Sequence, residues 1–159
     1  MLITPCEIPN NSFLNKCQNG IDFVDCYVCE APAVISQAVF IEAFYTSPLF
    51  KIERTLLKYL ASKPASDNDA KLLAQGQVNT FSAWRVEAQS SAELLLADYT
   101  GHTRSWLMAV PVNKQNSSAC TLLHFGSAVI AHANTKSQKP SLGFLFRALL
   151  GFHRVYSHL

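Results

Sequence analysis

The period of the hydrophobic pattern changes twice along this chain, and these changes limit the folds it can adopt. Apolar residues recur at helical spacing over residues 34–62 and then alternate with polar residues in several short segments of residues 81–132. Helical spacing returns in residues 140–159. This order predicts an α+β fold in which helices cover an antiparallel sheet.

Length and composition suit a single domain. The chain has 159 residues, of which 49% are hydrophobic and 15% are charged, so it contains enough apolar side chains for one core. Residues 1–20 are rich in Asn and Pro, and we expect an irregular lead-in there. Residues 21–159 are then expected to form one domain.

A strand followed by two helices is expected in the N-terminal half. The strand covers residues 21–30, where β-branched and aromatic residues are frequent. The helices are expected over residues 34–46 and 48–62. Ser47 can cap the second helix, and Pro48 suits its first position because the N–H of that position has no partner within a helix.

Short turns connect the segments of period two, which predicts an antiparallel meander. The expected strands cover residues 81–88, 93–99, 102–112 and 118–132. Together with the first strand, the pattern predicts five strands. Gly126 lies inside the last of them and predicts a bulge or a strong bend.

Residues 140–159 predict one long amphipathic helix, which could cover the concave face of a curved sheet. One side of this helix carries most of its apolar residues: Leu142, Leu145, Phe146, Leu149, Phe152 and Tyr156. The predicted fold class is therefore α+β, with a curved antiparallel sheet wrapped around a long C-terminal helix and two short helices after the first strand.

This element order resembles the START/Bet v 1-like (helix-grip, polyketide-cyclase-like) superfamily. Three phrases are similar to a bacterial branch of it: FYTSPLFKIERTLLKYL, LLLADYTGHTRSWL and LHFGSAV. The resemblance runs from about residue 21 to the end of the chain. It implies a helix-grip domain with a cavity between the sheet and the C-terminal helix, often for a small apolar or aromatic molecule. Some members are cyclases or dehydratases, and many only bind or carry.

The stretch from Glu93 to Val112 concentrates chemically versatile side chains. If Thr100 and Gly101 form a two-residue turn, Arg104 and Trp106 share one face of the hairpin and Asp98 lies on the other. Arg104 could bind a ligand carboxylate or stabilise an enolate. The structural alternative is an Asp98–Arg104 ion pair near the mouth of the hairpin. Either face could line the cavity, and we favour that of Arg104 and Trp106.

His124 is expected to be partly buried in the middle of a strand, either as a neutral hydrogen-bonded side chain or as a proton carrier. Trp84 and Trp106 suit an aromatic cavity wall, although tryptophans in strands often serve only the core. The predicted ligand-binding residues are Arg104, Trp106, Trp84, His124, Asp98, Phe146 and Leu149.

The five cysteines predict reduced thiols and no metal site or cofactor. Cys26 and Cys29 form a CxxC pair within an expected strand, which sends their side chains to opposite faces, about 10 Å apart along the backbone. Cys6, Cys17, Cys26 and Cys29 do not have the two-pair spacing of a structural zinc site. We expect buried strand cysteines.

Charge and hydropathy exclude several kinds of partner. The net charge is +2 without a Lys/Arg block, which argues against a nucleic-acid binder. The segment SLGFLFRALLGF is too short to span a membrane, and the N-terminus does not resemble a secretory signal, so a cytoplasmic protein is expected. The pattern leaves the oligomeric state open.

The predicted function is the binding or carrying of a small, largely apolar or aromatic molecule in a cavity between the sheet and the C-terminal helix. The first alternative is a cyclase- or dehydratase-type enzyme that uses Asp98, Arg104 and His124. The second is a protein-interaction module with a filled cavity. The sequence contains no GxSxG elbow, GxGxxG motif or phosphate-binding loop.

Overall fold

A computed structural model describes residues 2–17, 21–48, 50–52, 54–55, 64–113 and 119–130. Its elements, in chain order, are β1 (Ile3–Pro5), α1 (Phe13–Lys16), β2 (Ile21–Ala31), α2 (Gln37–Tyr45), α4 (Asp67–Ala74), β3 (Thr80–Phe81), β4 (Trp84–Gln89), β5 (Glu93–Asp98), β6 (Thr103–Val112) and β7 (Cys120–Ile130). None of the helices in these ranges is long and apolar enough to cross a membrane.

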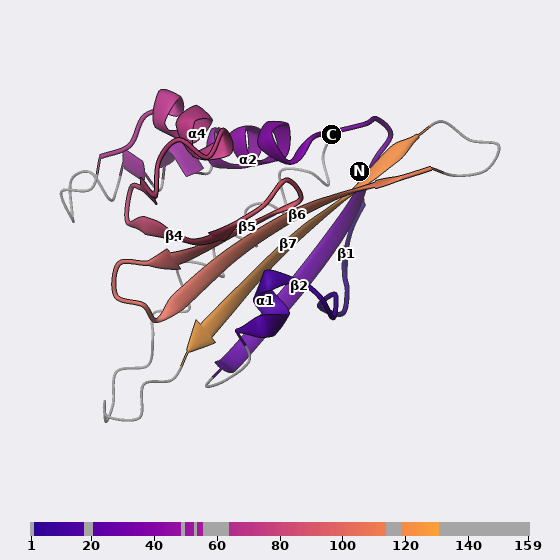
Figure 1. Cartoon of the computed structure of the whole chain (residues 1–159), viewed down its shortest axis with the longest axis horizontal. Coiled ribbons are helices and arrows are strands. Elements are labelled where there is room, and N and C mark those ends of the chain that lie inside the picture. Colours follow the sequence, from indigo (N-terminus) through magenta and orange to yellow (C-terminus); the bar gives the residue numbers. More distant parts are fainter. Residues whose placement is uncertain are drawn as a thin grey trace.

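The strands form one seven-stranded sheet in the order β1-β2-β7-β6-β5-β4-β3, and every neighbouring pair is antiparallel. The strands from β3 to β7 pair consecutively, which confirms the predicted meander. The three longest strands, β2, β7 and β6, lie side by side, and the sheet twists strongly along them (Figure 1). The two edge strands contain only three and two residues, and short edge strands limit pairing with other chains.

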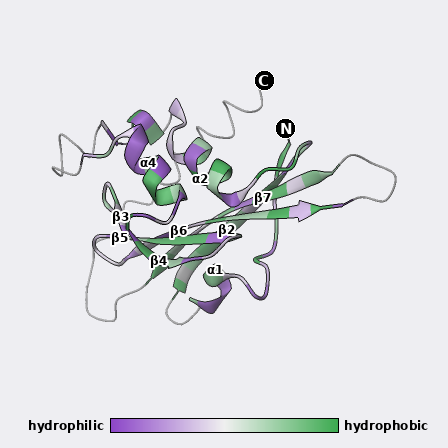
Figure 2. Ribbon diagram, turned by 45° about the horizontal axis from the view of Figure 1, so that its top comes forward, coloured by the Kyte–Doolittle hydropathy of each residue, from purple (hydrophilic) through white to green (hydrophobic). Residues whose placement is uncertain are grey.

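Helices lie on both faces of this sheet. Figure 2 shows α2 and α4 on one side and α1 on the other, and we call these sides the α2 face and the α1 face. The core of the α2 face includes Ile41, Tyr45, Leu73, Leu96 and Leu107. The core of the α1 face consists of Leu14, Cys26, Leu95, Trp106, Met108 and Ala128. The sheet therefore separates two apolar layers, in agreement with the consecutive apolar residues Leu94, Leu95 and Leu96 of β5.

The predicted fold class was wrong in its architecture. The structure is α+β with a seven-stranded antiparallel sheet, and within the described residues, which end at Ile130, no long C-terminal helix is wrapped by that sheet. The helix expected over residues 140–159 lies outside the described residues. The pattern of an amphipathic helix shows only that one side is apolar. It does not show which surface buries that side, and packing supplies most of the stability of a helix.

Two further differences concern the number of elements. The pattern predicted five strands, whereas β1 and β3 bring the sheet to seven. β1 and α1 both lie within the expected irregular lead-in, and they escaped prediction because three or four residues do not establish a hydrophobic period. Most of the helix expected over residues 48–62 lies outside the described residues.

The segment from β1 to α1 is fixed to the sheet by pairing and by a helix cap. β1 pairs with β2, with Ile3 opposite Cys29. Ser12 caps α1 by accepting a hydrogen bond from the backbone N–H of Asn15 at 3.2 Å. The Phe13 N–H donates to Glu93 Oε2 on β5 at 2.7 Å. These contacts hold Leu14, which is fully buried, against the α1 face.

Gly126 allows this close approach, and it does not mark a bulge. β7 pairs with β2 and β6 through Gly126 without a shift of register there. A Cβ atom at this position would lie 2.6 Å from Leu14 Cδ2 and 3.0 Å from both the Asp25 carbonyl oxygen and Trp106 Cε3. Glycine is therefore required here by the contact between α1 and the sheet, since there is no room for a side chain.

Replacing Gly126 with alanine is expected to destabilise the fold by about 1–3 kcal/mol, because the added methyl group overpacks this contact. Urea unfolding of the wild type and of Gly126→Ala measures the loss.

A double-mutant cycle with Leu14→Ala identifies the cause. Shortening Leu14 removes the closest contact, so Gly126→Ala should cost less in that background. Equal costs in both backgrounds would contradict a clash between α1 and β7.

Candidate functional site

The hairpin of β5 and β6 has the register expected for a two-residue turn. Leu95 lies opposite Trp106, and Ala97 lies opposite Arg104. Arg104 therefore lies on the α1 face, whereas Asp98 pairs with the core residue Trp84 on the α2 face. The sheet thus separates Arg104 from Asp98, as expected for a two-residue turn, and the alternative prediction of an Asp98–Arg104 ion pair was wrong.

Arg104 is already occupied by protein groups. Its Nε donates to Glu87 Oε2 at 2.6 Å, and its Nη1 donates to the carbonyl oxygens of Gly101 and Thr103 at 2.9 and 3.2 Å. Asp98 is not its partner: the Asp98 carboxylate accepts from the Thr103 N–H at 3.0 Å and from the Thr100 hydroxyl. Both side chains therefore stabilise the turn and its surroundings.

The two tryptophans belong to different core layers. Trp106 is fully buried on the α1 face, and its Nε1 donates to Glu93 Oε2 at 2.8 Å. Trp84 is buried on the α2 face, in the same cluster as Phe81 and Leu96. Their side chains therefore do not line one common wall.

His124 shares the α1 face with Trp106, and their ring centroids are 6.2 Å apart. Its Nδ1 is buried and has no hydrogen-bond partner among the described residues. Burial lowers the pKa of His124, although backbone groups of Met108 and Leu122 oppose the shift. His124 pairs with Met108, four residues along β6 from Arg104, which corresponds to roughly 13 Å. The structure therefore does not bring Arg104, Asp98 and His124 together.

The two remaining predicted ligand-binding residues, Phe146 and Leu149, lie outside the described residues. Within the described ranges, no three His, Cys, Asp or Glu side chains are grouped so that they could hold a metal ion.

A different polar group stands out on the α2 face. Asp25, Ser127 and Ser105 lie opposite one another on β2, β7 and β6, and form a row across three neighbouring strands. We call these three residues the polar row. Asp25 Oδ1 accepts from the Ser127 hydroxyl at 2.6 Å and from the Ser127 N–H at 3.0 Å. At the other end, the Ser105 and Tyr45 hydroxyls share a buried hydrogen bond of 3.1 Å.

Apolar and aromatic residues lie on both sides of the polar row. On one side Phe23 pairs with Val129, and on the other side Tyr27 pairs with Phe125. Phe23 is 42% exposed and lies near the start of β2, outside the part of the strand that pairs with β1. The Ser105 end of the polar row therefore lies in the core under α2. The Asp25 end lies on a part of the sheet that the described helices do not bury.

Tyr27 lies two residues from Asp25 on the same face of β2. Burial raises the pKa of Tyr27, and the negative charge of Asp25 raises it further. Asp25 Oδ2 and the Tyr27 hydroxyl have no hydrogen-bond partner among the described residues. A carboxylate oxygen and a protonated phenol are thus both available on one partly apolar surface.

The prediction from sequence did not include the polar row. In the segment IDFVDCYVCE, we considered only the two cysteines. Asp25, a charged residue among mostly apolar neighbours in a strand, was the residue that could have indicated the site. The partner of Asp25 is 102 residues away in the sequence, so sequence spacing could not identify it.

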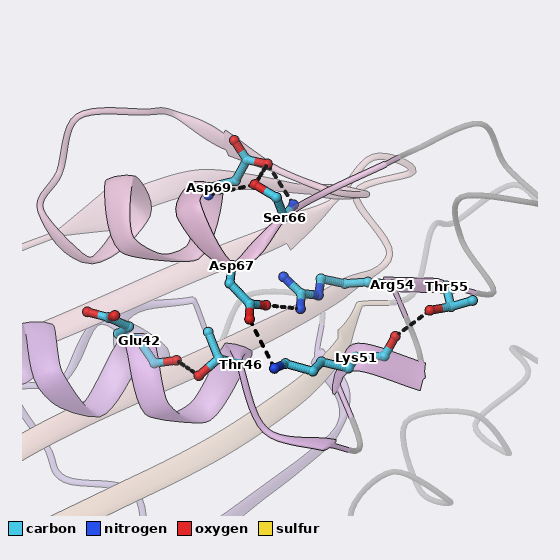
Figure 3. A network of polar contacts seen from close by, with 8 residues as sticks. All are labelled: Glu42, Thr46, Lys51, Arg54, Thr55, Ser66, Asp67 and Asp69. Carbon is cyan, nitrogen blue, oxygen red and sulfur yellow. Dashed lines mark hydrogen bonds and ion pairs between the residues drawn. The ribbon is translucent and has the colours of Figure 1, made fainter.

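A second polar cluster joins Lys51 and Arg54 to α4 (Figure 3). Asp67 accepts from Arg54 and forms an ion pair with Lys51 Nζ at 3.0 Å. The hydrogen bonds from Arg54 and from Lys51 lower the pKa of Asp67. Ser66 and Asp69 form a reciprocal cap at the start of α4. This cluster caps α4 and pairs Arg54 through Nη2, whereas the buried Arg54 Nε and Nη1 have no hydrogen-bond partner among the described residues.

Comparison of the chain with protein-family models, with curated proteins and with solved structures gives no match. The interpretation of the site therefore depends on its geometry.

His124 makes a specific contribution to the pH dependence of stability. Since its folded-state pKa lies below the ordinary value of 6.5, the unfolded chain takes up the proton first as the pH falls. The free energy of unfolding should therefore decrease as the pH drops through 6.5 towards the folded-state pKa. Urea unfolding at neutral pH and at a pH near 5 should show a larger loss for the wild type than for His124→Asn. Equal losses would show that burial of His124 is not responsible.

Proposed function

We propose that this protein binds a small, largely apolar molecule on the α2 face of the sheet and recognises a hydrogen-bond donor on it. The donor is a hydroxyl group or a protonated amine, and it contacts Asp25 and Tyr27. The observation that carries the proposal is the arrangement of the Asp25 carboxylate, which Ser127 holds through one oxygen only.

The two hydrogen bonds from Ser127 position the carboxylate before any ligand arrives. A pre-positioned acceptor loses little side-chain entropy on binding, which favours affinity. The second oxygen remains available for a donor, and the Tyr27 hydroxyl lies on the same face to accept or donate a further hydrogen bond. Ligand sites commonly combine a few fixed polar groups of this kind with a mostly apolar lining.

The surrounding residues favour an apolar or aromatic body for the ligand. Phe23 and Val129 border the polar row on one side, and Phe125 borders it on the other. Phe125 stacks on Phe44 of α2 with ring centroids 5.0 Å apart, which gives this part of the surface a firm aromatic base. A flat apolar ligand could bury the exposed part of Phe23, and this burial would be favourable.

The charge of Asp25 sets the chemical selectivity. A ligand carboxylate next to Asp25 would meet a like charge on a surface formed by β2 and β7, two strands that contain no Lys or Arg. A protonated amine or a hydroxyl can donate to the carboxylate, and hydrogen bonds to charged groups are the stronger kind. The proposed ligand class is therefore an apolar alcohol, phenol or amine.

Binding is favoured over catalysis. The cyclase or dehydratase hypothesis needs at least two of Asp98, Arg104 and His124 in one site. The sheet separates Asp98 from the other two, and Arg104 lies roughly 13 Å along β6 from the partner of His124. The interaction-module hypothesis remains a prediction, because no feature of the described residues favours it specifically.

Three naphthalene probes with different polar groups test this proposal: 2-naphthaleneethanol, 2-naphthylethylamine and 2-naphthaleneacetate. The alcohol and the amine should raise the melting temperature by about 3–6 °C at a concentration tenfold above Kd, and the carboxylate should raise it much less. Differential scanning fluorimetry measures the shifts, and isothermal titration calorimetry measures Kd.

Asp25→Asn tests the role of the carboxylate, because asparagine keeps an acceptor for Ser127 but removes the charge. It should weaken binding of the amine at least tenfold and reduce the preference over the carboxylate. Glu42→Gln is the matched control, since it removes one negative charge from the exposed side of α2. Tight binding of the carboxylate probe, or an unchanged affinity in Asp25→Asn, would contradict the proposal. So would the absence of a shift with all three probes.

A further inference from the structure

Two thiols meet where the N-terminal segment joins the sheet. Cys6 directly follows β1, and its N–H donates to the Cys26 carbonyl oxygen on β2 at 2.9 Å. The Cys6 thiol donates to Cys26 Sγ, with the two sulfur atoms 3.3 Å apart. Both side chains lie on the α1 face.

This geometry suits a covalent bond between the two sulfur atoms. Residues that face each other in a hydrogen-bonded antiparallel pair have Cα atoms about 5.5 Å apart, within the range of roughly 4.4–6.8 Å found for disulfides. The sulfur atoms need to approach from 3.3 Å to about 2.05 Å, which a small rotation of the side chains can provide. The paired strands already hold both backbones in place.

The other cysteines are placed differently. The Cys17 thiol donates to the Phe13 carbonyl oxygen, and the Cys120 thiol donates to that of Val112. Cys29 lies three residues from Cys26 along β2, on the α2 face. Among the described residues, Cys6 and Cys26 are the one pair of thiols in direct contact.

We propose that Cys6 and Cys26 form a reversible disulfide by exchange with a low-molecular-weight disulfide such as oxidised glutathione. The Cys6 thiolate attacks one sulfur atom of oxidised glutathione, whose S–S bond breaks and releases one glutathione thiolate. The Cys26 thiolate then attacks Cys6 Sγ, forms the Cys6–Cys26 bond and releases the second glutathione. The two protein thiols are oxidised, the glutathione disulfide is reduced, and both thiol protons end on the two glutathione molecules.

The order of the two attacks follows from exposure. Cys6 is partly exposed, whereas Cys26 is buried, so the external disulfide reaches Cys6 first. Burial also raises the pKa of Cys26. Cys26 is therefore the resolving thiol.

The bond would close a loop that contains α1. Residues 6 and 26 flank α1, whose Leu14 packs against the α1 face beside Gly126. Oxidation would thus fasten the N-terminal segment over Trp106 and the rest of this core layer, and reduction would leave it held by strand pairing and packing alone. The bond restricts the unfolded chain, so the oxidised protein should be the more stable form.

The experiment incubates the full chain with oxidised glutathione, blocks the remaining thiols with iodoacetamide and maps disulfides by peptide mass spectrometry. The expected main product is a peptide pair linked through Cys6 and Cys26. Its formation should raise the melting temperature by about 5–10 °C, and a reductant should reverse the rise.

Cys6→Ser should abolish both the linked peptide and the oxidative shift, whereas the matched control Cys29→Ser, on the same strand as Cys26, should keep both. The peptide map of the wild type tests the proposal independently of whether Cys6→Ser folds. Three results would overturn it: glutathione that remains on Cys6 while Cys26 stays free, a main product that links other cysteines, or complete alkylation of all five thiols.

Discussion

One carboxylate oxygen, Glu93 Oε2, links α1 to strands β5 and β6 on the α1 face of the sheet. Glu93 Oε2 accepts a hydrogen bond from the indole N–H of Trp106 and another from the backbone N–H of Phe13 at the start of α1. Both donors would otherwise lack an acceptor in a partly buried environment, where an unmade hydrogen bond costs about 1–3 kcal/mol. A single acceptor thereby aligns β5, β6 and α1, and it defines where Leu14 reaches the sheet.

The two faces of the sheet consequently have different characters. The α1 face is packed closely enough that Gly126 has no room for a methyl group, and its charged side chains are engaged by protein partners. The α2 face is packed under α2 and α4 but carries Asp25 and Tyr27 beyond them. An apolar surface with one pre-positioned carboxylate is suited to recognition, whereas a closely packed surface is suited to stability.

The sequence predicted those features that depend on local pattern and failed where distant residues decide. The register of the β5–β6 hairpin follows from a short turn and alternating residues, so the opposite placement of Asp98 and Arg104 was predictable. The ion pair of Arg104 with Glu87 was not predictable, because Glu87 lies on β4 at a shift of the strand register. The same limit applies to Asp25. Its partner Ser127 is 102 residues away in the sequence and becomes its neighbour only when β2 pairs with β7. The long C-terminal helix was predicted from a local apolar pattern, which does not reveal its packing surface.

The place of β2 in the sheet also constrains how the protein is made. β2 is the third of the described elements, yet it lies between β1 and the last described strand, β7, and the Asp25–Ser127 contact spans 102 residues. During synthesis, almost all the other described elements leave the ribosome before β7, the main partner of β2. Its apolar residues and unpaired backbone groups are exposed throughout this interval. Long-range pairing of this kind folds slowly, so the nascent chain passes through a period in which it depends on protection against aggregation.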